Sequence, residues 1–151
     1  MNNKLVSIIV PFEDDEKYIV NDLIPALAKQ LYSPFELLLV PNAKFKISDP
    51  PKFVKILTHS GSPASKRDYA VSKSRGMILA FIDSDAYPAD SGWLIKAVKF
   101  LEESQVAVVG GPGITPTDNN TFQQTSGLVW SSWLGAGGAG TYRNLPEASR
   151  W

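Results

Sequence analysis

The stretch MILAFIDSDAY, residues 77–87, is an apolar run that ends in two carboxylates with one residue between them. Its first six residues contain no polar side chain. A half-exposed strand alternates apolar with polar residues, so this run predicts a strand that is buried on both faces. Asp83, Ser84 and Asp85 then emerge at the carboxyl end, where open α/β sheets bind their ligands. Paired acids there favour a cation and a phosphate-bearing substrate, although the same residues ahead of a Tyr-Pro pair are also typical of an ordinary turn.

The composition is that of an ordinary globular domain. Of 151 residues, 44% are hydrophobic and 20% charged, which suffices for one domain with a buried core, or one domain and the start of another. Lys plus Arg and Asp plus Glu number 15 each, so no net charge favours nucleic acid or an acidic membrane. The absence of cysteine excludes disulfides, thiolate metal sites and thiol catalysis, and fits a cytoplasmic location. The apolar run at residues 5–10 is too short for a membrane span.

Strand and helix patterns alternate through the first 110 residues. Apolar runs predict strands at residues 5–10, 35–40, 53–57, 77–82 and 106–109. Periodicity and capping signals predict helices at residues 16–31, 63–75 and 93–101. Pro25 is expected to kink the first helix, and Ser62 and Gly76 bracket the second. This alternation predicts an α/β fold: a mainly parallel, Rossmann-like sheet with right-handed crossovers and helices on both faces.

The sequence changes character near Thr115. Residues 115–125 are polar, and no clean periodicity runs from there to the end of the chain. We therefore expect a single α/β domain over residues 1–115, followed over residues 116–151 by the start of a second region that is apparently truncated at the C-terminus.

Asp85 is the candidate metal ligand. A strand-end carboxylate can hold Mg²⁺ or Mn²⁺ between diphosphate oxygens and so neutralise charge on a leaving nucleotide. Asp83 is better placed for a hydroxyl of a ribose or sugar. Arg67, on the helix that leads into this strand, has the type and place for a diphosphate contact. Two plainer interpretations stay open: the acids cap a turn or the following helix, and Arg67 belongs to an exposed basic face with Lys66, Lys73 and Arg75.

Residues 65–88, SKRDYAVSKSRGMILAFIDSDAYP, resemble the signature of family 2 glycosyltransferases of the GT-A fold, in which Ala-Arg-Asn, a glycine and Asp-x-Asp recur at set spacings. Arg67 resembles the family's arginine and Gly76 its glycine. Asp83 with Asp85 resembles its Asp-x-Asp. The opening VSIIVPFEDDEKYI is similar to the family's first strand and nucleotide-facing loop, which adds to the site Pro11, Phe12 and Glu13.

The resemblance implies a GT-A-like, nucleotide-sugar-binding domain and, from residue 116, the start of an acceptor-side region. It implies a glycosyltransferase of hexosyltransferase type that is dependent on Mn²⁺ or Mg²⁺. Such an enzyme transfers a sugar with inversion from a nucleotide-diphosphate sugar to a hydroxyl of an unidentified glycan, lipid or small-molecule acceptor. No nucleic acid partner is expected. The parent protein is expected in the cytoplasm, either free or in peripheral association with the inner face of the membrane.

Some positions depart from the family pattern. The Asn after the family's arginine is Asp68 here, and the acid pair after its second strand is replaced by Pro41 and Asn42. The Asn42 amide can still pair with a nucleobase edge. In similar enzymes an acidic residue beyond this region is the general base for the acceptor hydroxyl. The well-separated acidic residues beyond Asp90 here are Asp118 and Glu147, neither in a convincing sequence context, so the base is unassigned. The alternative function is therefore a nucleotide-sugar-binding module without turnover.

Other motifs favour other functions less well. Three glycines within residues 135–140 spell G-x-G-x-x-G, but no clean strand precedes them. Asp-x-Asp also opens aspartate-nucleophile phosphatases, where it follows the first strand rather than the fourth. His59 is expected in a solvated turn. Trp130 and Trp133 are equally consistent with stacking on a sugar and with an apolar surface covered by another segment.

Overall fold

A computed structural model describes residues 4–117, 119–132 and 134–135 of the chain. The chain divides into two compact units, Met1–Lys99 and Phe100–Trp151. Within the described residues, no helix combines the length and apolar character that crossing a membrane requires.

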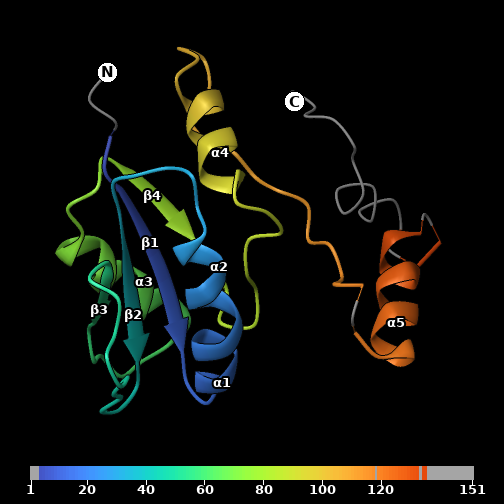
Figure 1. Cartoon of the computed structure of the whole chain (residues 1–151), viewed down its shortest axis with the longest axis horizontal. Coiled ribbons are helices and arrows are strands. Elements are labelled where there is room, and N and C mark those ends of the chain that lie inside the picture. The colour runs from blue at the N-terminus through green and yellow to red at the C-terminus, as the bar shows by residue number, and fades with distance from the viewer. Residues whose placement is uncertain (1–3, 118, 133, 136–151) are drawn as a thin grey trace. The chain divides into compact units, whose positions relative to one another are not determined.

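The first unit is built on a parallel sheet. Its four strands are β1 (Val6–Phe12), β2 (Phe35–Pro41), β3 (Val54–Ile56) and β4 (Ile78–Phe81). They lie in the order β3-β2-β1-β4, and each neighbouring pair is parallel (Figure 1). The two central strands are the apolar runs VSIIVPF and FELLLVP, and both are almost wholly buried. The parallel α/β fold predicted from the alternating pattern is therefore confirmed.

Helices cover both faces of this sheet. On one face lie α1 (Glu16–Tyr18), η1 (Ile19–Leu23), α2 (Ile24–Ala28) and α4 (Trp93–Leu101), and on the other lies α3 (Pro63–Lys73). The first group fills the larger core with Ile19, Leu23, Leu27, Leu94 and Val98 against Ile8, Val10, Leu37 and Leu39. The second core is small, because α3 contributes chiefly Ala70, packed on Ile9, Leu38 and Val40.

The first helical segment is disturbed around its proline. We predicted one helix with a kink at Pro25, and the structure instead has a turn of π-helix, η1, directly before α2. Proline lacks an N–H and its ring clashes with the carbonyl four residues earlier, so the backbone widens there to π-type hydrogen bonding.

The first strand is longer than expected. We predicted a strand that ends at residue 10, but β1 continues to Phe12. The Ile9 carbonyl accepts from the Ile82 amide on the β4 side, so Pro11, two residues on, faces that same side. The last β1–β4 register pair is Ile9 and Phe81, so β1 continues past the β4 ladder at Pro11, which has no N–H to donate to it.

The fourth strand is not buried on both faces, which corrects our expectation for residues 77–82. Ile78 and Ala80 pack on the larger core, whereas Leu79 and Phe81 on the other face are 39% and 51% exposed. In the described part of the chain, β4 has β1 as its single strand neighbour and lies at the end of the sheet. The apolar run thus predicted the strand correctly but not the exposure of one of its faces.

Residues 106–109 do not form the predicted strand. The Val106 amide donates to the Glu103 carbonyl at 3.0 Å, a turn that follows α4, and the residues after it are irregular. Four apolar residues are a weak strand signal, and no described strand pairs with them. The second unit instead contains α5 (Thr121–Ser131), which we did not predict. Its sequence signal was the reciprocal capping box between Asn120 and Gln123.

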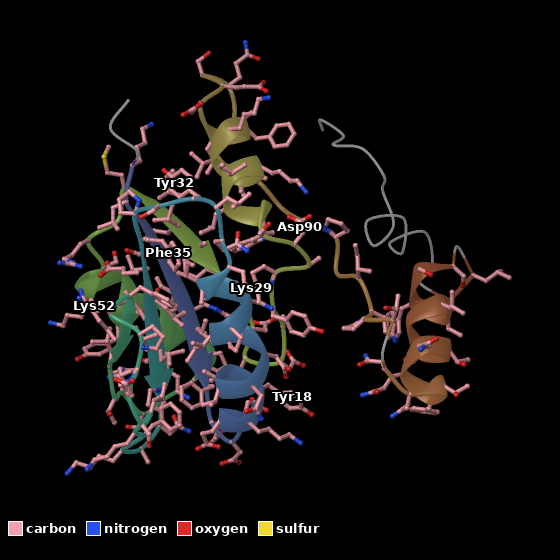
Figure 2. The ribbon with its side chains drawn as sticks, in the orientation of Figure 1. Tyr18, Lys29, Tyr32, Phe35, Lys52 and Asp90 are labelled. Atoms are coloured by element: carbon pink, nitrogen blue, oxygen red, sulfur yellow. The ribbon has the colours of Figure 1, made fainter. Side chains whose placement is uncertain are left out.

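The loop after β4 is anchored to the end of α2. The Gln30 side chain donates to the Asp90 carbonyl at 2.8 Å, and the Leu31 amide donates to the Ser91 carbonyl at 2.9 Å. Figure 2 labels Lys29, the residue after α2, and Asp90 in the loop after β4. The Asp90 carboxylate accepts from the Gly92 amide at 2.7 Å at the start of α4. Lys96 lies 2.7 Å from the same carboxylate and, by this hydrogen bond, lowers the pKa of Asp90.

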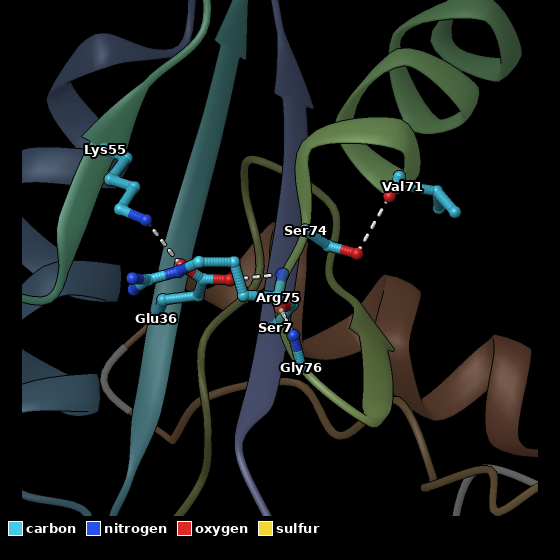
Figure 3. A network of polar contacts seen from close by, with 7 residues as sticks. All are labelled: Ser7, Glu36, Lys55, Val71, Ser74, Arg75 and Gly76. Carbon is cyan, nitrogen blue, oxygen red and sulfur yellow. Dashed lines mark hydrogen bonds and ion pairs between the residues drawn. The ribbon is translucent and has the colours of Figure 1, made fainter.

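A buried polar network closes the amino end of the sheet. Glu36, 2% exposed, accepts from the Ser7 hydroxyl, the Lys55 ammonium, and both the backbone amide and the guanidinium of Arg75 (Figure 3). Burial alone would raise the pKa of this carboxyl, but these donors outweigh it and lower the pKa from 4.5 to about 2. The network therefore holds the loop before β4 against β1, β2 and β3.

Candidate functional site

The predicted site residues gather at the opposite, carboxyl edge of the sheet. Glu13 follows β1, Asn42 follows β2, and Asp83 and Asp85 follow β4. These three strands are neighbours in the order β2-β1-β4, and parallel strands end at one edge, so the three loops share that edge.

An ion pair joins α3 to the end of β4. Arg67 Nη2 lies 2.8 Å from Asp83 Oδ1, and the two side chains are 35% and 74% exposed. Arg67 is held in the second turn of α3, whose start is capped by the Ser62 hydroxyl, which accepts from the Ser65 amide at 3.3 Å. The structure thus brings together two residues that sequence analysis had assigned separately to the diphosphate and to a sugar hydroxyl.

The interpretation of the acid pair as caps of α4 is wrong for the described structure. Ahead of α4 it is the Asp90 carboxylate that accepts a backbone amide, that of Gly92, and Asp83 contributes to a turn through its backbone carbonyl, which accepts from the Ala86 amide at 3.1 Å. The Asp83 side chain is engaged with Arg67 instead.

Asp85 is exposed, and in the described part of the chain no hydrogen bond or ion pair engages its carboxylate. Among the same residues, no group of three or more His, Cys, Asp or Glu is arranged to hold a metal ion. Mg²⁺ and similar ions commonly take one or two protein carboxylates and complete their shell with substrate phosphates and water. A free carboxylate beside a second, arginine-paired one fits a metal held in that way, not a closed protein cage.

On the other side of β1, Glu13 and Asn42 are hydrogen-bonded to each other. The Asn42 amide nitrogen donates to Glu13 Oε1, and Asn42 Oδ1 accepts from the Gly61 amide at 3.4 Å. The amide of Asn42 is therefore oriented by both neighbours, with Glu13 fixing which end of the amide is the donor.

Phe12 and Pro11 contribute backbone rather than side chains to this edge. The Phe12 ring is buried and packs edge-on against Phe45, with ring centroids 5.1 Å apart. Pro11 is buried within β1 and pairs with Val40. Phe12 still presents its carbonyl, which accepts from the Lys66 ammonium at 2.6 Å.

The basic residues near Arg67 do not form the common exposed face that we had kept open. Lys66 is only 3% exposed, and Arg75 pairs with Glu36 at the other end of the sheet. Sequence analysis missed the burial of Lys66. The available signal was its helical spacing, because Lys66 lies four residues before the buried Ala70 and so shares its face of α3.

Two further contacts were not anticipated. The Ser84 hydroxyl donates to Asp15 Oδ2 at 2.7 Å and so ties the loop after β4 to the loop after β1. His59 is not in a solvated turn: its ring stacks on Tyr69 with centroids 4.3 Å apart, and its Nε2 lies 3.1 Å from Ser65 Oγ. Its backbone amide also donates to the Pro41 carbonyl at 3.0 Å, which keeps the chain after β3 against β2.

Several other predicted features lie outside the described residues. Asp118, Glu147, Trp133 and most of the glycine-rich segment at 135–140 are among them.

The parallel sheet with helices on both faces places the chain in the class of GT-A-like α/β domains. The sequence model of glycosyl transferase family 2 matches residues 7–147. The chain belongs to that family.

Individual relatives agree with this assignment. The chain is 30% identical over 122 residues to the poly(ribitol-phosphate) beta-N-acetylglucosaminyltransferase TarS of Staphylococcus aureus, a match that covers 72% of this chain and 21% of TarS. It is 30% identical over 114 residues to the O-antigen biosynthesis protein RfbC of Myxococcus xanthus, covering 70% of this chain and 9% of RfbC. The chain thus spans about a fifth or less of these relatives.

Solved structures show the same fold. The crystal structure of S. aureus TarS 1–349 in complex with UDP-GlcNAc matches 75% of this chain and 38% of that one, with a TM-score of 0.57 and 26% identity. The mannosyltransferase PcManGT from Pyrobaculum calidifontis, in complex with GDP-Man and Mn²⁺, matches 75% of this chain and 36% of its own, with a TM-score of 0.58. At 21% identity the second likeness concerns the fold alone.

Proposed function

We propose that this chain is the donor-binding part of a glycosyltransferase and binds a nucleotide-diphosphate sugar at the carboxyl edge of β2, β1 and β4. The observation that carries the proposal is the Arg67–Asp83 ion pair beside an unengaged Asp85. It places a guanidinium and a free carboxylate together where the fold class binds ligands.

Each residue then has a role that its contacts suit. Asp85 is the protein ligand of Mn²⁺ or Mg²⁺, and such an ion, when bound, neutralises charge on the diphosphate leaving group. Arg67 holds Asp83 in place and offers its remaining N–H donors to a phosphate oxygen. The Asp83 carboxylate accepts from a hydroxyl of the ribose or sugar.

The opposite side of the site suits the nucleobase. Asn42, oriented by Glu13 and Gly61, presents an amide to a base edge. Support from outside this chain comes from the TarS structure, which holds UDP-GlcNAc, and from PcManGT, which holds GDP-Man and Mn²⁺. The acceptor in the full protein is a hydroxyl of a glycan, a lipid or a small molecule.

Calorimetric titration tests the donor site. UDP, GDP, dTDP and CDP sugars are titrated into the chain with Mn²⁺ and again with EDTA. We expect one of them to bind at least about tenfold more weakly when the metal is removed, and Asp85→Asn to abolish that difference. Asp49→Asn is the matched control, because Asp49 is also exposed and its φ of 50° is one that asparagine tolerates. Equal affinity of Asp85→Asn in Mn²⁺ would refute the assignment.

A turnover assay on the same preparation separates transfer from binding alone. Release of the nucleoside diphosphate from the sugar donor, with and without candidate acceptors, identifies an active transferase. Tight, metal-dependent binding with no release identifies a nucleotide-sugar-binding module without turnover. An aspartyl phosphate on Asp83 would instead identify a phosphatase.

A further inference from the structure

The lysine beside Arg67 is buried at the carboxyl edge of the sheet. Lys66 is 3% exposed, and its ammonium donates to the Phe12 carbonyl at 2.6 Å. Phe12 is the last residue of β1, and Glu13 follows it directly. The Lys66 ammonium therefore lies where β1 ends, between α3 and the loop that carries Glu13.

Its charge is not balanced inside the described structure. Among the described residues no carboxylate forms an ion pair with Lys66, and a carbonyl dipole is its hydrogen-bond partner. The other buried ion, Glu36, has two cationic partners, Lys55 and Arg75. An ammonium without a counter-charge is costly to bury, whereas methionine would fill similar space without that cost.

Neighbouring acids do not supply the missing charge. Asp83, the carboxylate at the end of β4, is taken by Arg67. Glu13 accepts from Asn42. The edge thus contains a buried positive charge whose natural counter-ion is an anion arriving from solution, and the proposed donor carries one in its diphosphate.

We propose that Lys66 is a positioning residue of the donor site whose buried ammonium is the internal counter-charge for the diphosphate of the nucleotide sugar. This inference rests on the function proposed above. Lys66 acts in two ways: it holds the Phe12 carbonyl and hence the loop after β1, and it raises the affinity for charged ligands through the weakly screened field of a buried ion.

The test compares ligands that differ only in phosphate charge. Affinities for UDP and GDP are measured by calorimetry, and those for uridine and guanosine by NMR titration, because the nucleosides bind weakly. Lys66→Gln removes the charge but keeps a hydrogen-bond donor, and Lys66→Arg keeps the charge. We expect Lys66→Gln to weaken diphosphate binding on the order of tenfold and nucleoside binding less than about twofold, with Lys66→Arg near the parent.

Lys73→Met is the matched control, because it removes one positive charge from an exposed position on the same helix. It should change neither affinity by more than about twofold, since an exposed charge is screened by solvent. A loss in Lys66→Gln that is equal for nucleosides and diphosphates, or no loss at all, overturns the proposal and leaves the donor site standing. Failure of the parent chain to bind any nucleotide overturns both.

A second measurement avoids any folding defect of the variants. The side-chain Nζ resonance of Lys66, assigned by through-bond correlation to its own backbone in ¹³C,¹⁵N-labelled protein, is followed in the unaltered chain. It should move on addition of UDP or GDP and stay in place with the nucleoside. A resonance that is indifferent to the diphosphate refutes the proposal even if every variant unfolds.

Discussion

The Ser7 hydroxyl donates a hydrogen bond of 2.8 Å to the carboxylate of Glu36, its register partner across β1 and β2. The same hydroxyl accepts from the Gly76 amide at 2.8 Å, so this pair also holds the residue that leads into β4. β4 ends next to Asp83 and Asp85. A network at the amino edge therefore sets the position of the strand that presents the acids at the opposite edge.

Removing the charge of Glu36 should destabilise the fold. We expect Glu36→Gln to lower the free energy of unfolding by about 2–4 kcal/mol, because two cations and a backbone amide lose their charged acceptor. Urea denaturation monitored by circular dichroism measures this change in the free energy of unfolding. Lys55→Met is the control and should cost about 1 kcal/mol or less, since Lys55 is partly exposed and Arg75 still pairs with Glu36. Equal costs would contradict this account.

Stability should fall in acid because of the same carboxyl. The pKa of Glu36 is about 2 in the fold against an ordinary 4.5, so its contribution is complete above pH 4.5 and is lost as the pH falls towards 2. The gap corresponds to roughly 3 kcal/mol. Unfolding free energies from pH 6 to pH 2 should therefore converge between the parent and Glu36→Gln. A constant difference over that range would show that the carboxyl is not protonated there.

Gly76 should not tolerate a side chain. A Cβ at this position would lie 2.5 Å from the Ser7 amide nitrogen and 2.9 Å from the Leu5 carbonyl oxygen, and neither backbone atom can move without disturbing β1. We expect Gly76→Ala to cost about 3 kcal/mol or more in thermal or urea unfolding. Gly110→Ala, where no described atom lies within 4 Å, should be within about 0.5 kcal/mol of the parent. Similar losses for the two variants would argue against close packing at Gly76.

The Arg67–Asp83 pair should matter for binding more than for folding. Both side chains are partly exposed, so Arg67→Met should change the free energy of unfolding by less than about 1 kcal/mol. The same change should weaken nucleotide-sugar affinity by about tenfold or more, because the guanidinium contacts phosphate in the proposed site. Calorimetry and urea denaturation on one preparation measure both. A large loss of stability with unchanged affinity would make the pair structural.

Much of the fold could be predicted from local patterns. Ser62 and Pro63 marked the start of α3, and the buried runs marked β1 and β2. The strand predicted at residues 106–109 was wrong, because four apolar residues do not reveal whether a partner strand exists. Helix α5 was missed, because the capping box at Asn120 was overlooked. The burial of β4 was overestimated, since exposure depends on what covers each face.

The sequence by itself determined the four strands of the sheet, the capped helix and the acids at the end of β4, because hydrophobic runs, cap residues and an Asp-x-Asp are encoded in adjacent positions. Only the tertiary structure decided which polar groups meet: Arg67 with Asp83, Lys66 with the Phe12 carbonyl, and Glu36 with Ser7, at sequence separations of 16, 54 and 29 residues. Such pairings follow from strand order and register, which bring distant residues to one edge of the sheet and leave no trace in the local pattern.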